Sequence, residues 1–156
     1  LVRHVLLQQA GMSLSAHIDD LGRTLGEELL EPTRIYAKAC LDLARHTDTH
    51  AMSHITGGGL AANLERVMPA HLDAKIDRAT WQRPPIFDLV QRVGRVETED
   101  LERTLNCGVG MVALVGAAEA QAAVETLARH GIAAWVAGEV TAEGHGQVTV
   151  EGTHAI

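Results

Sequence analysis

The stretch His54-Ile55-Thr56-Gly57-Gly58-Gly59 is the strongest local signal in this sequence. The apolar residues 51–55 lead into it, and residues 60–67 follow it with apolar side chains at helical spacing, ending before Pro69. We predict a tight turn into a helix here. Three glycines remove every Cβ atom from the turn, so that a ligand can approach the backbone N–H groups, and the helix adds the positive end of its dipole. The pattern favours a phosphate or another oxyanion, and the alternative is a structural turn that requires positive φ angles.

Apolar periodicity elsewhere predicts further helices and, in the last third of the chain, strands. The predicted helices cover 1–10, 32–46, 86–94, 98–105 and 117–130, with Pro32 in a first turn, Thr98 as an N-cap and Gly131 after a last turn. The predicted buried strands cover 109–115, 132–136 and 147–150, and residues 70–85 are left as a mixed segment. This order, helices first and a strand–helix–strand unit later, predicts a mixed α/β (α+β) fold in which a β-sheet is layered with α-helices.

Composition excludes several classes of protein. The chain has 156 residues, which predicts one domain over 1–156, and 46% of them are hydrophobic, which excludes a disordered chain. No apolar run approaches the roughly 20 residues that a membrane helix needs. The formal net charge of −7, without a basic cluster, argues against a nucleic-acid surface. The only two cysteines form no CxxC pair, which favours reduced thiols in a cytoplasmic protein.

A second loop, Asn106-Cys107-Gly108-Val109-Gly110-Met111, precedes a predicted strand. Its two glycines bring the backbone close to a neighbouring group, and the Asn106 side chain both donates and accepts hydrogen bonds. We interpret the loop either as part of a site or as a packing turn between a helix and a strand. Cys107 would act as a nucleophile only beside a base, and the sequence places none there.

Two further patterns are weaker indications of a functional site. His46, His50 and His54 are spaced by four, which on one unbroken helix would form a zinc-binding face, but Thr47-Asp48-Thr49 is a poor helix interior. We therefore predict no metal site. Arg34 falls in the predicted first turn after Pro32, where a positive charge opposes the helix dipole, so an ion pair or an anionic partner is expected for it.

Several of these strings follow one another in an order that closely resembles a known family. They are Glu31-Pro32-Thr33-Arg34-Ile35-Tyr36, then His54-Ile55-Thr56-Gly57-Gly58-Gly59-Leu60 with Asn63, Arg66 and Pro69, then Ile86-Phe87, then 103–111, and then Trp135-Val136-Ala137-Gly138-Glu139-Val140. The family is phosphoribosylformylglycinamidine cyclo-ligase, or aminoimidazole ribonucleotide synthetase, and the resemblance is to its carboxyl-terminal domain over most of residues 1–142. The combination of five ordered motifs is specific, although each one alone is weak.

The resemblance implies a step of de novo purine biosynthesis in the cytoplasm. ATP activates the formyl amide oxygen of formylglycinamidine ribonucleotide by phosphoryl transfer, and the amidine nitrogen then closes the imidazole ring to give aminoimidazole ribonucleotide. Family members use Mg²⁺ and are homodimers, and their amino-terminal domain supplies most of the ATP and metal site. This chain starts at Leu1 within an apolar pattern and holds no such domain, so we expect a carboxyl-terminal fragment that is inactive alone.

The resemblance also implies a set of substrate- or phosphate-binding residues, while the catalytic residues stay unassigned. The set is His54, Thr56, Gly57, Gly58, Gly59, Asn106 and Gly108. Two alternatives remain for the function. One is a domain of a paralogous ATP-using enzyme, such as thiamine-monophosphate kinase, selenophosphate synthetase or formylglycinamidine ribonucleotide synthetase. The other is a non-catalytic module that binds an anion.

Overall fold

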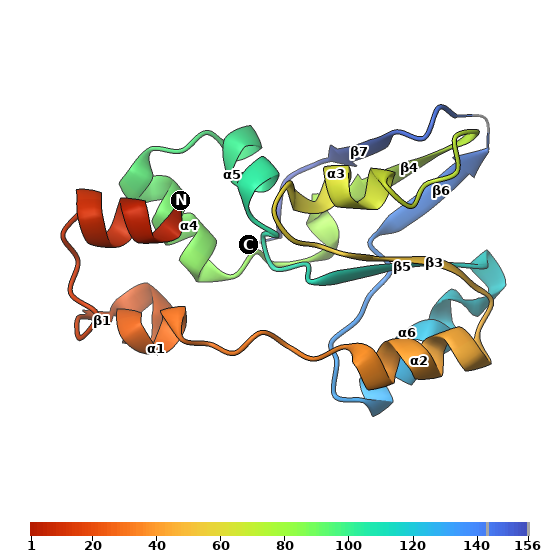
Figure 1. Cartoon of the computed structure of the whole chain (residues 1–156), viewed down its shortest axis with the longest axis horizontal. Coiled ribbons are helices and arrows are strands. Elements are labelled where there is room, and N and C mark those ends of the chain that lie inside the picture. Colours follow the sequence, from red (N-terminus) through yellow and green to blue (C-terminus); the bar gives the residue numbers. More distant parts are fainter. Residues whose placement is uncertain (143, 156) are drawn as a thin grey trace.

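The computed structural model describes residues 1–142 and 144–155. Figure 1 shows helices and small sheets arranged in two groups, joined by an extended segment between α1 and α2. The helices are η1 (His4–Gln9), η2 (Asp19–Leu21), α1 (Leu25–Leu29), α2 (Ala37–His46), α3 (Gly59–Glu65), η3 (Arg78–Thr80), α4 (Pro85–Gly94), α5 (Thr98–Thr104), η4 (Ala117–Glu119) and α6 (Ala120–Arg129). The strands are β1 (His17–Ile18), β2 (Arg23–Thr24), β3 (Thr49–His54), β4 (Leu72–Asp77), β5 (Met111–Val115), β6 (Gly138–Ala142) and β7 (Val148–Glu151).

The described strands form three small sheets. β1 pairs with β2, β3 pairs antiparallel with β5, and β4 lies between β6 and β7, antiparallel to β6 and parallel to β7. Helix α3 contacts both β3 and β7, and therefore links the two larger sheets. On the other side of the β3–β5 pair lie α2 and α6, which pack against each other (Figure 1).

Two hydrophobic clusters stabilise the two groups of elements. The first joins α3 to the larger sheets through Ile55, Leu60, Leu64, Met68, Ala74, Ile76, Trp81, Val109 and Val148. The second packs η1, α1, α4 and α5 together through Val5, Leu6, Leu25, Leu89, Val90, Leu101 and Cys107. Trp81 and Cys107 belong to different clusters, yet the indole Nε1 of Trp81 donates to the Cys107 carbonyl at 3.2 Å. The second loop thus lies where the two clusters meet.

The mixed α/β class and the helices predicted at 86–94 and 117–130 are confirmed, as is the strand at 147–150. The prediction that helices come first and the sheet later is wrong, because β3 and β4 lie in the first half of the chain. The segment 70–85, predicted as mixed, contains β4, the central strand of its sheet. Its sequence Leu-Asp-Ala-Lys-Ile-Asp alternates apolar and polar residues, which is the period of a half-buried strand.

The predicted strand at 132–136 is also wrong. That segment has no regular structure, and the strand that follows α6 is β6. Trp135 and Ala137, which are partly buried, still pack on the first cluster, whereas Val136 is exposed. β5 and β6 belong to different sheets, so the expected strand–helix–strand unit does not form. β5 is partly exposed along its whole length, unlike the strand buried on both faces that its apolar run predicts.

Two helix starts differ from their predictions. The helix expected from Pro32 begins at Ala37, and Ile35, within the predicted helix, is 85% exposed. Arg34 therefore lies in the extended segment rather than in a first helical turn. The N-cap of α5 is Glu97 rather than Thr98, whose hydroxyl instead accepts a hydrogen bond from Gln91 Nε2 at 2.9 Å.

Candidate functional site

The glycine loop between β3 and α3 is held from inside by Asn63. The buried side-chain amide of Asn63 donates to the backbone carbonyls of Thr56, Gly57 and Gly59 at 3.3, 3.2 and 2.7 Å. The backbone carbonyl of Asn63 in turn accepts a hydrogen bond from the Ser53 hydroxyl at 2.7 Å, which anchors α3 to β3. Because the carbonyls of the loop are turned towards Asn63, its outer surface is formed by Thr56 and Gly57, which are both exposed.

The three glycines of the loop have different structural roles. A Cβ atom on Gly57 would meet no described atom within 4 Å, so this position is open. Gly58 and Gly59 have φ angles of +102° and +73°, a conformation that other residues rarely adopt. Gly59 also lies against α5, where a Cβ atom would overlap the carbonyl oxygen of Glu102. Gly59 therefore serves packing, whereas Gly57 and Gly58 leave backbone accessible.

The second loop is a tight turn built around Asn106. The Asn106 side-chain oxygen accepts from the Gly108 N–H at 3.2 Å, and its backbone carbonyl accepts from the Val109 N–H at 3.0 Å. Cys107 lies between them with a φ of +48°, and Gly108 follows at +98°. A Cβ atom on Gly108 would lie 2.5 Å from Pro84 Cδ, so this glycine is required for close packing.

Gly58 and Asn106 line the same cavity, which has a volume of about 300 Å³. Its remaining walls come from α3, α5 and the residue after it, the second loop, the start of η3, Trp81 and β7. The residues are Leu60, Ala61, Ala62, Glu65, Arg78, Trp81, Glu99, Glu102, Arg103, Leu105, Cys107 and Val150. Of the residues predicted for the site, His54, Thr56, Gly57, Gly59 and Gly108 are not part of this lining. The structure therefore brings one of the predicted site residues of each loop to one cavity, and the other five do not line it.

A bidentate ion pair forms one wall of this cavity. Arg78 Nε and Nη2 donate to the two carboxylate oxygens of Glu102, each at 2.7 Å. Arg78 Nη1 also donates to the carbonyl of Val150 at 2.5 Å, so that the pair connects η3, α5 and β7. The hydrogen bonds from Arg78 lower the pKa of Glu102, because they favour the ionised carboxylate, and outweigh the effect of burial.

Cys107 does not have the properties of a nucleophile. Its thiol is buried, and burial, the largest cause, raises its pKa to about 11. The thiolate, which is the reactive form, is therefore scarce at neutral pH. His154 lies near the same wall, with its ring centre 4.9 Å from that of Trp81. Burial is the main cause that lowers the pKa of His154, and the nearby Arg83 adds to it.

The three histidines spaced by four do not share a face. His46 ends α2, whereas His50 and His54 lie in β3. His46 and His50 pair with the nearby carboxylates of Asp42 and Asp48, at 2.8 and 3.3 Å. Within residues 1–142 and 144–155, no three His, Cys, Asp or Glu side chains are grouped in a way that could hold a metal ion. No helix among these residues has the length and apolar character to cross a membrane.

Sequence reasoning gave no role to several residues that build the site. Asn63 carried one available signal, since asparagine is a poor residue for a helix interior unless its side chain has a partner. Arg66 lies beside the glycine loop, with Nη1 3.3 Å from Asn63 Oδ1 and Nη2 3.9 Å from the place of a Gly58 Cβ atom. Arg78 and Glu102 are distant in sequence, and no local pattern predicts that they form an ion pair.

Comparison with known proteins gives consistent results. A family model described as "AIR synthase related protein, C-terminal domain" matches residues 5–151. A protein of Streptomyces fradiae, provisionally named phosphoribosylformylglycinamidine cyclo-ligase, is 58% identical over 92% of this chain and 79% of its own. Enzymes of that name from Carboxydothermus hydrogenoformans and Sorangium cellulosum are 43% and 47% identical, each over about 92% of this chain. This chain spans only 41% and 42% of the length of those two relatives.

A solved structure shares the fold. The hydrogenase maturation protein HypE matches with a TM-score of 0.57, over 96% of this chain and 46% of its own. The sequence identity of 20% makes this a likeness of fold alone.

Proposed function

The chain belongs to the family of AIR synthase related proteins, as their C-terminal domain, and we propose that it serves the ATP-dependent ring closure of formylglycinamidine ribonucleotide to aminoimidazole ribonucleotide. Relatives named for this cyclo-ligase match along more than 90% of the chain. They include one relative at 58% identity, of which the chain covers 79%. We also propose that the protein acts in purine biosynthesis and in the cytoplasm.

Within this reaction, the glycine loop holds a phosphate group of the substrate or of the nucleotide. The observation that carries this assignment is the turn at Gly57-Gly58, exposed at Gly57 and half-buried at Gly58, with the Arg66 guanidinium beside it. Asn63 keeps the carbonyls of the loop inside, so that an anion on the outer side does not face them. Fixed backbone N–H donors and a cation stabilise phosphate charge without reorganisation. His54 and Thr56 flank the loop, and both are exposed.

Asn106 and Gly108 contribute from the second loop. Asn106 faces the cavity that Gly58 also lines, and Gly108 fixes the turn that places it there. The two loops therefore present polar groups to one region from two directions. We assign Asn106 to a contact with the ligand and Gly108 to the shape of the turn.

The chemistry itself is shared with another part of the complete enzyme. ATP supplies the phosphoryl group that activates the amide oxygen, and in the proposal ATP and Mg²⁺ are held mainly by the amino-terminal domain. The complete enzyme is a homodimer. The chain supplies a substrate half-site, so it binds a phosphate compound but does not turn it over alone. The length of the relatives, more than twice the matched part in two of them, supports this division.

Separate titrations of the purified chain test the proposal. Inorganic phosphate, formylglycinamidine ribonucleotide and ATP are added one at a time, and binding is followed by calorimetry and by the backbone amide resonances of Gly57 and Gly58. We expect the substrate to bind and to shift these resonances, and phosphate to shift the same ones more weakly. Binding of ATP alone would assign the loop to the nucleotide. Measurable ring closure by the chain with ATP and substrate would overturn the division of labour.

A further inference from the structure

Three motifs that are far apart in sequence meet at the side chain of Tyr36. Tyr36 is the last residue before α2 and is half-buried. Its ring lies edge-on to that of His54, with ring centres 6.1 Å apart and an interplanar angle of 63°. Its hydroxyl occupies the space beside Gly110, where a Cβ atom would overlap it. The phenol, at the end of the segment 31–36, thus contacts the start of the glycine loop and the second loop.

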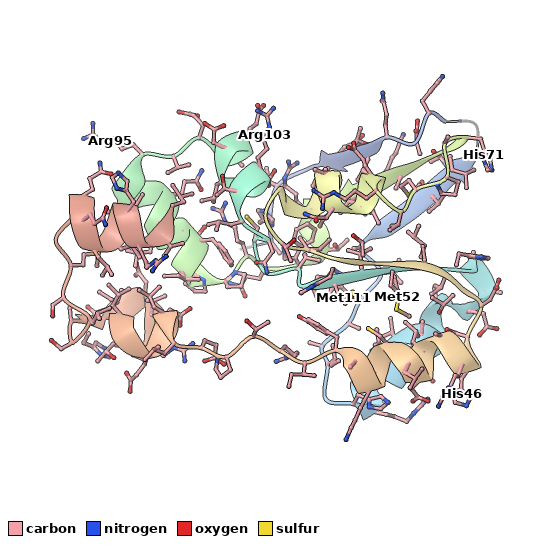
Figure 2. All side chains as sticks on the ribbon, in the orientation of Figure 1. His46, Met52, His71, Arg95, Arg103 and Met111 are labelled. Atoms are coloured by element: carbon pink, nitrogen blue, oxygen red, sulfur yellow. The ribbon has the colours of Figure 1, made fainter. Side chains whose placement is uncertain are left out.

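The backbone geometry explains why these groups meet. His54 pairs with Met111 at the end of the β3–β5 ladder, and the Ile55 N–H donates to the Gly110 carbonyl at 3.0 Å, one step beyond. Side chains alternate between the faces of a strand, so His54 lies on the same face as Met52. Figure 2 shows Met52 and Met111 on the side of the strands that faces α2. Tyr36, which leads into α2, closes that face at its end.

We propose that Tyr36 is a positioning residue that fixes the His54 imidazole at the edge of the glycine loop, where His54 contacts the phosphate group of the substrate. The inference rests on the proposed function, in which His54 flanks the glycine loop that holds the phosphate. His54 is exposed and lies at the end of a strand, so its ring is otherwise free to leave the loop. An edge-to-face aromatic contact restrains such a ring, because the positive edge of one ring meets the negative face of the other.

The test uses the full chain and inorganic phosphate as the probe, with affinity measured from NMR titration of the His54 ring and the loop amides. Tyr36→Ala and Tyr36→Leu both remove the aromatic contact, and the second keeps apolar bulk in case the first fails to fold. Both weaken phosphate binding by about threefold or more, as expected for the loss of an aromatic pair. Tyr36→Phe keeps the ring and restores the affinity. Ile35→Ala, at the exposed neighbouring position, serves as the matched control and changes nothing.

A double-mutant cycle separates positioning from general stability. In a His54→Ala background, Tyr36→Leu has no further effect on phosphate affinity, because the residue that it positions is gone. An equal loss in both backgrounds would overturn the inference while leaving the phosphate site in place. If the His54→Ala variant bound phosphate as tightly as wild type, His54 would have no role in binding, and the inference would be overturned. Failure of the wild-type chain to bind phosphate or substrate would instead count against the proposed function.

Discussion

The backbone of Gly59 lies directly against the carbonyl oxygen of Glu102, with no room for a side chain between them. This contact joins the start of α3 to α5 and thereby fixes the glycine loop relative to the cavity wall. Consecutive glycines in one motif therefore have different physical roles, since a Cβ atom on Gly57 would meet open space.

Gly59→Ala is expected to destabilise the fold by about 3 kcal/mol or more, because it adds a buried overlap to a strained positive φ angle. Gly57→Ala, at an open position in the same loop, is expected to change stability by less than about 0.5 kcal/mol. Urea unfolding followed by circular dichroism measures both. Equal effects of the two substitutions would show that the contact with Glu102 does not restrict Gly59.

Gly58→Asp is expected to weaken binding of inorganic phosphate by about tenfold, since a carboxylate placed at the loop repels the anion. Gly58→Ala is the matched control, because it introduces the same backbone strain at a φ of +102° without the charge. The ratio of the two affinities therefore reports the charge alone. If both variants bound phosphate equally well, the anion would lie elsewhere.

Glu102→Gln and Arg78→Met are each expected to cost about 2 kcal/mol, as they break a charge-assisted, half-buried pair. A double-mutant cycle should show a coupling energy of similar size, since the two residues contact each other directly. Additive losses of stability would mean that Arg78 and Glu102 stabilise the fold independently of each other and not through their ion pair. Thermal unfolding of the four proteins provides the measurement.

The same pair predicts the direction of a pH dependence. The pKa of Glu102 is lower in the folded chain than its unfolded value of about 4.3, so ionisation favours folding. This stabilisation is fully present above the unfolded pKa and is lost as the pH falls through the lower folded value. Between pH 5 and pH 3, wild type should therefore lose more stability than Glu102→Gln. Parallel losses in both proteins would contradict the assignment.

The two cysteines are expected to differ in reactivity. Cys107 is buried and has a pKa of about 11, whereas Cys40 is only partly buried, although burial raises its pKa as well. At pH 8, iodoacetamide should modify Cys40 first and reach Cys107 only when urea unfolds the chain. Mass spectrometry of peptides identifies the modified residue, and Cys40→Ser isolates the slower one. Rapid labelling of native Cys107 would show that the second loop opens.

The sequence by itself determined the elements whose signal is local. Helix α4, with apolar residues at helical spacing, and β7, next to turn residues, need no distant partner to be recognised. The tight turn at the three glycines was also predictable from the sequence, because consecutive residues without a Cβ atom are typical of such a turn. The mixed α/β class follows from these elements together.

Tertiary structure alone decided which of these signals became contacts. The apolar segment 132–136 is only partly buried and is not paired in a sheet, although Trp135 packs on the first cluster, since a strand requires a neighbour with free backbone groups. The helix after Pro32 begins at Ala37, and Tyr36, just before it, is placed against Gly110 and His54. The Arg78–Glu102 pair and the contact of Gly59 with α5 join residues that are remote along the chain. Periodicity and local spacing describe the neighbours of a residue in sequence, whereas the position of the site depends on contacts that only the folded chain brings together.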